Sequence, residues 1–329
     1  MIQYIASIAT EGAVFSIMAL GLNVIWGWAG DFDIAFYGYV AIGVYMAMVT
    51  TIGRLPPPDQ YIFGWHLPFL LALLVATVSA ALLALLVGAV ALRKLRATYY
   101  AITTLSAVLM LQIFIGNYTP LFNGYNGLYG MDQPFNGVLN LSPEVYPFFF
   151  LAFCVAVLLI VYFILERLST SPFGRALRAI REEERAAAAF GRNIYALKLK
   201  AYVIGAAVGG LGGGLFAAYL GAFNPTAWSP IETLLLYAAI FVGGSGNTRG
   251  VILGVFLVSV LFQEITRFLP SVGGNASFAP AVRMILVGAM ILVTMRYRIQ
   301  GLLPEPRSKD AVAEKVAAKQ YARRGSAAD

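Results

Sequence analysis

The residues of this chain that are most able to do chemistry are the carboxylates that interrupt its apolar sequence. Asp31 and Asp33 stand in the run GLNVIWGWAGDFDIAFYGYVAIGVY at 21–45, and Glu11 stands in the first apolar run. An ionised carboxylate at the centre of a bilayer costs about 3 kcal/mol, so it has to face water or a partner. These acids could therefore bind a proton or a cation, or meet a polar solute.

Other common kinds of site chemistry lack their residues. His66 and Cys154 are each the only residue of their type, which excludes a metal site of Cys and His ligands. With only His66 available, we find no Ser-His-Asp set in the sequence. The sequence GGSGNTRG at 243–250 has the glycines of a phosphate-binding loop but not its Lys, so we expect no ATP hydrolysis by this chain. Glu232 and Glu264, at the edges of apolar runs, are expected at the membrane interface.

The segment GRALRAIREEERAAAAFG at 174–191 is dense in charge although the sequence around it is apolar. Its apolar residues Leu177, Ile180, Ala187 and Phe190 are spaced to share one face of a single helix. A water-exposed helix that joins two membrane spans needs a reason to be there. We interpret this one as a docking surface for a cytoplasmic partner.

Composition places the chain among all-α, polytopic integral membrane proteins, because 60% of its residues are hydrophobic and 12% are charged. We expect about nine transmembrane helices, within a range of eight to ten, in one integral membrane domain over 1–304, with a tail over 305–329. The predicted spans are 4–26, 34–52, 67–92, 98–116, 146–166, 198–221, 231–244, 250–268 and 280–297.

The distribution of Lys and Arg predicts the orientation of these spans. If the charged segment is cytoplasmic, only Arg54, Arg267 and Arg283 fall in loops on the other side. The loop at 117–146 has no Lys or Arg, which is typical of an external loop. We therefore expect the N-terminus outside and the C-terminus in the cytoplasm. The net charge of +7 arises at span ends and does not indicate nucleic acid binding.

Two apolar segments contain interruptions of the kind that mark a transport path at the membrane midplane. Gly27, Gly30 and the two aspartates interrupt 21–45, and Gly243, Gly244, Gly246 and Gly250 interrupt 234–254. Ordinary cytoplasmic turns between spans explain both patterns equally well. In GAAVGGLGGGL at 205–215, by contrast, glycines four residues apart indicate close helix packing.

Six stretches in order along the chain resemble the larger permease subunit of the branched-chain amino acid type of ABC importers, and the resemblance covers residues 5–305. They are LGLNVIWGWAGDFDIAFYGYVAIGVY (20–45), RATYYAITTL (96–105), NGYNGL (123–128), SPFGRALRAIREEERAAAAFGRNIYALKLKAYVIGAAVGGLGGGLFA (171–217), FVGGSGNTRGVILG (241–254) and GLLP (301–304).

The resemblance implies that the charged segment couples this chain to an ATPase. The positions that match the family in this role are Gly174, Arg175, Arg178, Ile180, Glu184, Ala187, Ala188 and Gly191. In the broader ABC-importer pattern Glu precedes Gly by six residues, whereas Glu184 precedes Gly191 by seven and Arg185 holds the six-back position. The contact of Glu184 therefore does not carry over directly.

The same resemblance implies the partners and the place of action. It implies a bacterial inner-membrane subunit that pairs with a second, related permease, two cytoplasmic ATPase subunits and an extracytoplasmic solute-binding protein. ATP and Mg²⁺ belong to the ATPase subunits, and this chain binds no cofactor.

Departures from the family pattern bear on the transported solute. The residues 33–36 replace a Ser-Leu-Gly-His-like run, and 123–127 replace a Gly-Gly-Ser/Thr-Asp-Gly loop. These changes favour a solute other than leucine, isoleucine or valine. The family that the chain resembles also includes importers of urea, amides and other small polar or carboxylated compounds, so the sequence leaves the solute class open. The candidate path residues are Asn23, Asp31, Asp33, Thr103, Thr104, Asn123, Asn126, Gly243 and Gly244.

Two other functions fit the composition. One is a stand-alone, ion-coupled secondary carrier that uses Glu11, Asp31 or Asp33 as its coupling site. The other is a passive channel for a small solute.

Overall fold

A computed structural model describes residues 2–53, 64–94, 97–227, 230–261, 278–297 and 300–305. These ranges are almost entirely helical, which confirms the predicted all-α membrane fold. The long helices are α1 (Ile2–Asn23), α2 (Phe36–Thr51), α3 (Phe69–Lys94), α4 (Ala97–Asn117), α7 (Tyr146–Thr170), α10 (Ile194–Leu220), α11 (Pro230–Gly243) and α14 (Phe278–Tyr297). The shorter elements are η1 (Val24–Trp28), α5 (Thr119–Phe122), η2 (Gly124–Asn126), β1 (Leu128–Tyr129), α6 (Asn136–Leu139), α8 (Pro172–Glu182), α9 (Glu184–Ala189), β2 (Ala222–Phe223), η3 (Pro225–Ala227), α12 (Thr248–Val255) and η4 (Phe256–Leu261).

The predicted count of nine spans is not confirmed. Within the described ranges six helices are long and apolar enough to cross a membrane, and Phe36–Thr51 and Thr248–Val258 are shorter apolar helices. The 16 residues of α2 make a helix of about 24 Å, less than the ~30 Å hydrocarbon core. The remainder of the predicted span 250–268, including Glu264, lies outside the described residues.

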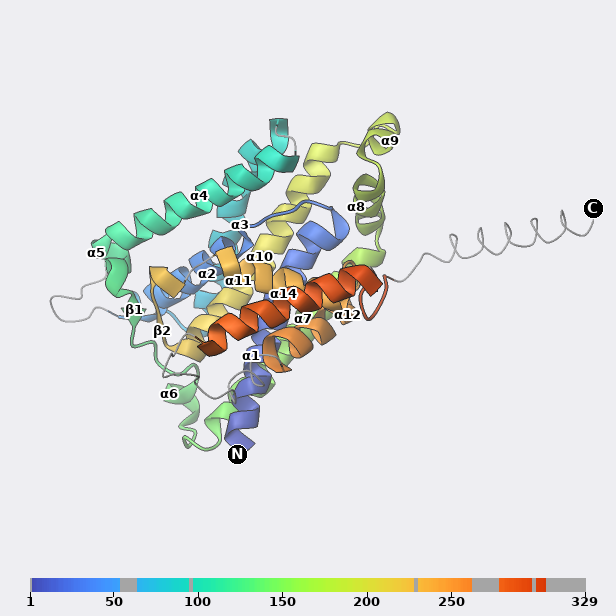
Figure 1. Ribbon diagram of the computed structural model, residues 1–329. Coiled ribbons are helices and arrows are strands. Elements are labelled where there is room, and N and C mark those ends of the chain that lie inside the picture. Colours follow the sequence, from blue (N-terminus) through green and yellow to red (C-terminus); the bar gives the residue numbers. More distant parts are fainter. Residues whose placement is uncertain are drawn as a thin grey trace, which may run out of the picture.

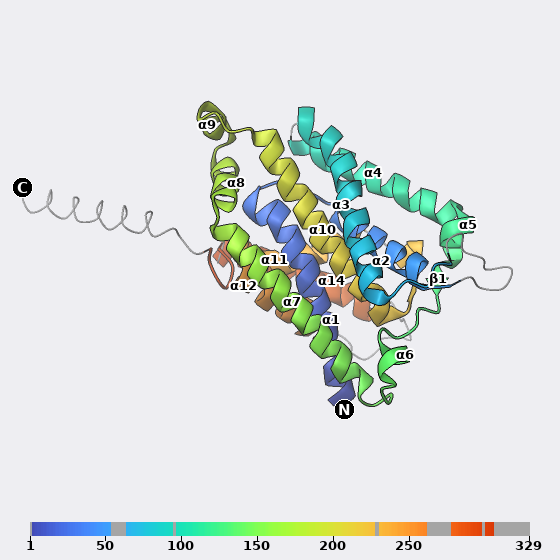
Figure 2. The same ribbon diagram turned by 180° about the vertical axis from the view of Figure 1, so that it is seen from behind.

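Helix α10 forms the centre of the bundle and packs against α1, α2 and α3 (Figures 1 and 2). The glycines of 205–215 make these contacts close, as their spacing predicts. A methyl group at Gly213 would lie 2.2 Å from the Val40 carbonyl oxygen, and one at Gly43 would lie 2.4 Å from the Gly210 carbonyl oxygen. The helix backbones are therefore in direct contact along this face. Close backbone packing of this kind stabilises helix association in a membrane, where the hydrophobic effect does not drive helices together.

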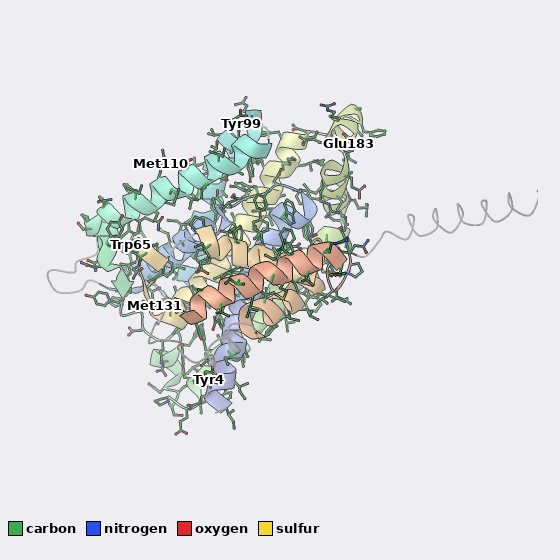
Figure 3. The ribbon with its side chains drawn as sticks, viewed as in Figure 1. Tyr4, Trp65, Tyr99, Met110, Met131 and Glu183 are labelled. Atoms are coloured by element: carbon green, nitrogen blue, oxygen red, sulfur yellow. The ribbon has the colours of Figure 1, made fainter. Side chains whose placement is uncertain are left out.

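The outer helices present apolar side chains to their surroundings. On α4, Tyr99 and Met110 point away from the bundle (Figure 3) and are 60% and 70% exposed. On α3, Leu86 and Val90 are each 69% exposed. Apolar side chains on an outer helix face are the side chains that lipid accommodates.

The bundle has two distinct ends. The α8 end consists of α8, α9 and the segment 300–305, and α1 finishes there. The β end consists of α5, α6 and the antiparallel pair β1 and β2, in which Leu128 faces Phe223 (Figure 1). α1 begins near α6, so it runs from one end of the bundle to the other (Figures 1 and 2).

The interruption of 21–45 is a true discontinuity inside the bundle. α1 continues into a π-helical turn, η1, and residues 29–35 form no regular helix before α2 begins. The ring of Phe36 sits between Gly21 and Gly209, where an added methyl group would lie 3.2 Å and 2.7 Å from its Cζ. The chain thus turns back along α1 before α2 begins.

The interruption of 234–254 is a tight turn, the alternative that the sequence left open. α11 and α12 lie against each other on either side of residues 244–247. A methyl group at Gly254 would lie 2.0 Å from the Ala239 carbonyl oxygen, and one at Gly243 would lie 2.0 Å from that of Gly250. These glycines therefore serve the packing of a helical hairpin.

The prediction of one continuous charged helix over 174–191 is wrong. Glu183 has an extended backbone with φ −152° and ψ 98°, and it separates α8 from α9. Leu177 and Ile180 are buried on α8, which packs against α7, α10 and η1, while α9 packs against α8 and α10. Phe190 consequently leaves the shared apolar face and is 87% exposed.

We expect Gly43→Ala to destabilise the folded chain by about 1–3 kcal/mol, because the added methyl group has no room against Gly210. Thermal unfolding of the detergent-solubilised protein measures the effect. Gly137→Ala is the control, since its methyl group would meet no atom within 4 Å. Equal unfolding temperatures for the two variants would refute the close contact between α2 and α10.

Candidate functional site

α8 is held at its N-terminus by a close turn from α7. Pro172 occupies the first turn and the Ser171 hydroxyl accepts a hydrogen bond from the Gly174 amide at 3.5 Å. Gly174 is buried, and a methyl group there would lie 2.3 Å from the Ser169 carbonyl oxygen. The predicted coupling residue Gly174 thus makes the turn that sets the direction of α8.

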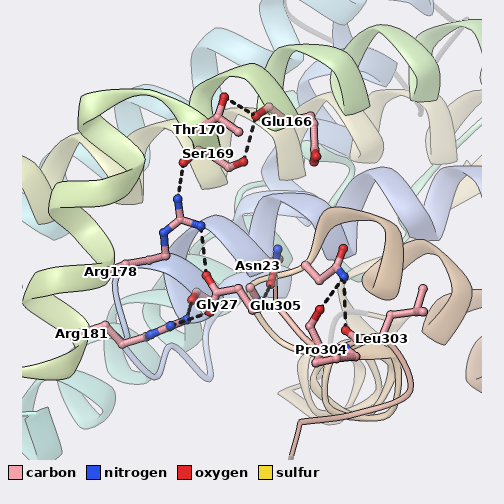
Figure 4. A network of polar contacts seen from close by, with 12 residues as sticks. Asn23, Gly27, Glu166, Ser169, Thr170, Arg178, Arg181, Leu303, Pro304 and Glu305 are labelled. Carbon is pink, nitrogen blue, oxygen red and sulfur yellow. Dashed lines mark hydrogen bonds and ion pairs between the residues drawn. The ribbon is translucent and has the colours of Figure 1, made fainter. Parts of the chain in front are cut away.

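Two arginines on α8 bind the same carboxylate. Arg178 Nη1 lies 3.2 Å from Glu305 Oε1, and Arg181 Nη2 lies 2.6 Å from Glu305 Oε2 (Figure 4). Arg178 also donates to the Ser169 carbonyl at 2.6 Å, and Arg181 donates to the carbonyl of Gly27. We call Arg178, Arg181 and Glu305 the Glu305 clamp. Sequence reasoning missed Glu305, which it assigned to the tail.

The residues before Glu305 are hydrogen-bonded to the α11–α12 turn. The amides of Leu302 and Leu303 donate to the carbonyls of Val242 and Gly243 at 2.8 and 2.9 Å. The Asn247 side-chain amide donates to the carbonyls of Leu303 and Pro304 at 3.3 and 2.9 Å (Figure 4). We call residues 300–305 the C-terminal strap.

Three candidate path residues lie in this packed region at the α8 end. The Asn23 side-chain oxygen accepts a hydrogen bond from the Gly246 amide at 2.9 Å, which joins α1 to the α11–α12 turn. Gly243 contacts α12, and Gly244, with φ +121°, lies against the carbonyl of Leu303. Asn23, Gly243 and Gly244 therefore hold segments together and are not gathered around a common polar centre.

The remaining coupling candidates divide into exposed and buried positions. Arg175, Glu184, Ala188 and Gly191 are exposed, whereas Ile180 and Ala187 are buried. Gly191 adopts φ +74°, and a side chain there would meet no atom within 4 Å. Together with Phe190, the exposed Glu184, Ala188 and Gly191 form a surface on α9 and its C-terminal flank that the rest of the described chain leaves uncovered, while Arg175 lies in the first turn of α8.

Lys198 on α10 links this surface to the discontinuous segment. Its ammonium lies 2.8 Å from the Asp31 carboxylate and 3.2 Å from the Glu184 carboxylate. The side chains of Lys198 and Asp31 are only 15% and 14% exposed. Asp31 therefore has the partner that a carboxylate in an apolar region requires.

Asp33 lies deeper in the bundle and is fully buried. Its amide donates to the Tyr237 hydroxyl at 2.9 Å, and its Oδ1 accepts from the Ala35 amide at 2.8 Å. The hydroxyls of Tyr202 and Thr104 lie near the carboxylate, but its Oδ2 makes no hydrogen bond within the described part of the chain.

More phenol groups surround this carboxylate. The Tyr39 and Tyr202 hydroxyls are 2.5 Å apart, and the buried Tyr100 ring contacts that of Tyr202. We call Asp33, Tyr39, Tyr100, Thr104 and Tyr202 the Asp33 cluster. Its members come from the non-helical segment before α2, from the first turn of α2, from α4 and from α10.

The other path candidates are separate from the Asp33 cluster. Thr103 is half-buried on α4. Asn123 adopts φ +56° at the β end and its side chain donates to the Gly127 carbonyl at 2.9 Å, while Asn126 is exposed in the same turn. Glu11 is half-buried on α1. The structure thus brings together only Asp33 and Thr104, with Asp31 beside them.

The fold and this arrangement describe a multi-pass membrane protein with a polar centre and an exposed helical surface at one end. A profile of the family "Branched-chain amino acid transport system / permease component" matches residues 4–295. The chain belongs to this family of transport permeases, whose members are membrane subunits and not enzymes.

Individual relatives agree with this assignment. The chain is 31% identical over 320 residues to the high-affinity branched-chain amino acid transport system permease protein LivM of Escherichia coli K12, covering 91% of this chain and 70% of that protein. It is 31% identical over 240 residues to the probable branched-chain amino acid transport permease protein LivM of Methanocaldococcus jannaschii, covering 71% and 68%. It is 25% identical over 292 residues to the high-affinity permease protein LivH of Escherichia coli K12, covering 84% and 90%. No solved structure matches the chain.

We expect Lys198→Met to lower the stability of the chain by about 3–5 kcal/mol, because it leaves the Asp31 carboxylate enclosed without a counter-charge. Adding Asp31→Asn should recover much of that loss. Thermal unfolding in detergent measures both effects, with Lys200→Met, exposed on the same helix, as the control. A double variant no more stable than Lys198→Met would contradict the pairing.

Proposed function

We propose that the chain is the transmembrane permease subunit of an ATP-driven ABC importer for branched-chain amino acids or a related small polar or carboxylated solute. Family membership, carried by the match over residues 4–295, is the observation that supports this proposal most directly. The names of the LivM and LivH relatives suggest the solute class and the existence of a second, related permease as partner.

In this proposal α8 and α9 dock onto cytoplasmic ATPase subunits, two per importer, which hold ATP and Mg²⁺. The exposed Phe190 and the adjacent Gly191, with open space around it, support such a role, because aromatic anchors surrounded by small residues suit a protein interface. Arg175 and Glu184 add exposed charge to the rim of the surface. The chain itself needs no cofactor.

The α8 end faces the cytoplasm in this proposal, and the protein lies in a bacterial inner membrane. Arg175, Arg185, Arg192 and Arg249 are exposed at that end, whereas the loop 117–146 at the β end has no Lys or Arg. This orientation places the N-terminus outside, the C-terminus inside, and the β end toward an extracytoplasmic solute-binding protein.

The solute path is proposed to pass the Asp33 cluster. Among the described residues, one oxygen of the Asp33 carboxylate has no hydrogen-bond partner, and hydroxyl groups lie beside it, a combination suited to the ammonium group of an amino acid or to the N–H groups of a polar solute. The cluster is enclosed here, so access requires the alternating conformations of a transporter driven by its ATPases. Asp33 stands where the family has Ser, so we propose that this position distinguishes the solute of this importer.

We expect Phe190→Glu and Gly191→Trp each to reduce the ATPase that co-purifies with the chain at least about tenfold, since a lost interface anchor costs about 2 kcal/mol or more. The measurement is quantitative co-purification from native membranes. The control Tyr125→Glu changes an exposed aromatic residue at the β end. Undiminished co-purification of both α9 variants would refute docking at this surface. Uptake by the purified chain alone, driven by a proton or sodium gradient, would instead identify a secondary carrier.

We expect Asp33→Asn to lower ATP-dependent uptake by about tenfold or more, because an amide replaces a charged hydrogen-bond acceptor. Radiolabelled leucine and other amino acids, supplied to proteoliposomes with the complete importer, provide the assay. Asp132→Asn, exposed at the β end, is the matched control. If Asp33→Asn transports like the control, the path does not use the carboxylate.

A further inference from the structure

Resting on the proposed docking of ATPases at α8 and α9, we infer that Glu305 transmits the movement of α8 to the bundle. The inference concerns a residue outside the coupling segment. Glu305 is the residue through which the C-terminal strap binds α8, and the strap is hydrogen-bonded to the α11–α12 turn. The Glu305 clamp thus connects an exposed docking element to two segments inside the protein.

The first step is the contact between α8 and the strap. Each oxygen of the Glu305 carboxylate accepts from a different arginine, at 3.2 Å from Arg178 and at 2.6 Å from Arg181. The three side chains are between 21% and 25% exposed, so water competes for these contacts only in part. Because two guanidinium groups of α8 bind the Glu305 carboxylate, the strap resists displacement along α8 in either direction.

The second step is the contact between the strap and the α11–α12 turn. Two strap amides extend the hydrogen bonding of the C-terminus of α11, and Asn247 binds two strap carbonyls. Gly301, with φ +70°, lets the strap approach Gly244 so closely that a methyl group on Gly301 would lie 2.5 Å from the Gly244 Cα. The strap and the turn therefore move as one unit.

The third step reaches the discontinuous segment that leads to the Asp33 cluster. Arg181 donates to the carbonyl of Gly27 in η1 as well as to Glu305 (Figure 4). The Asn23 side chain, one turn earlier, binds the Gly246 amide of the α11–α12 turn. A displacement of α8 therefore pulls on η1 directly through Arg181 and on the α11–α12 turn through Glu305.

The competing role for Glu305 is that of a brace, which only keeps α8 in place for docking. The two roles differ in what happens after an ATPase has bound. Loss of a brace reduces the amount of bound ATPase. Loss of a transmitting residue leaves the ATPase bound and active, while the solute moved per ATP falls.

The test compares the complete importer carrying native chain, Glu305→Gln, Glu305→Asp or the control Glu144→Gln, which changes an exposed acid outside α8 and α9. Co-purified ATPase, ATP hydrolysis and uptake of radiolabelled leucine and other amino acids are measured on the same proteoliposomes. We expect Glu305→Gln to retain ATPase and hydrolysis while uptake per ATP falls about tenfold or more, the change that one lost charge-assisted hydrogen bond corresponds to. Glu305→Asp should recover part of the uptake, and Glu144→Gln should resemble native chain.

A double variant examines whether Glu305 acts through the arginines. Adding Arg178→Gln to Glu305→Gln should lower uptake per ATP less than Arg178→Gln does in native chain. Native uptake per ATP in Glu305→Gln would overturn the inference, and so would loss of the ATPases from that variant, which identifies a brace. A native chain that binds no ATPase would instead overturn the proposed function itself.

Discussion

A non-helical backbone inside a lipid-facing bundle is stable only where protein groups satisfy its polar atoms. The structure meets this requirement between η1 and α2 with side chains from distant helices. The Tyr237 hydroxyl both accepts from the Asp33 amide and donates to the Asp33 carbonyl, at 2.9 and 3.2 Å. The Thr233 hydroxyl accepts from the Tyr37 amide at 3.0 Å. Side chains of α11 thus stabilise the non-helical segment between η1 and α2. The polar centre of the bundle depends on these hydrogen bonds.

The close packing of α10 makes this arrangement possible. Its glycine face packs against both α1 and α2, and the Phe36 ring fills the space beside Gly21 and Gly209. The same helix carries Lys198 toward the α8 end and Tyr202 toward Asp33. One rigid helix therefore positions both the ion pair and the phenol groups that flank residues 29–35.

The discontinuous segment also contacts residues of α8 and is linked through Lys198 to α9. Gly27 binds Arg181 of α8, and Asp31 shares Lys198 with Glu184 of α9. A movement at this surface and a change around Asp33 are thus linked through a few consecutive residues. These short connections support a coupling between the docking surface and the Asp33 cluster that passes through contacting residues. Substitutions of those residues can test such a coupling.

The sequence by itself determined the membrane class, the helical fold, the family, the packing role of 205–215 and the interruption of 21–45, because each follows from local composition, spacing or motif. Tertiary structure decided what depends on distant partners. It paired Asp31 with Lys198, joined Arg178 and Arg181 to a residue more than a hundred positions away, and separated Asn123 from Asp33. It also split the charged segment at Glu183 and exposed Phe190, since the extended backbone of Glu183 redirects the chain after α8, whose packing against α7, α10 and η1 outweighed the regular spacing of the apolar residues.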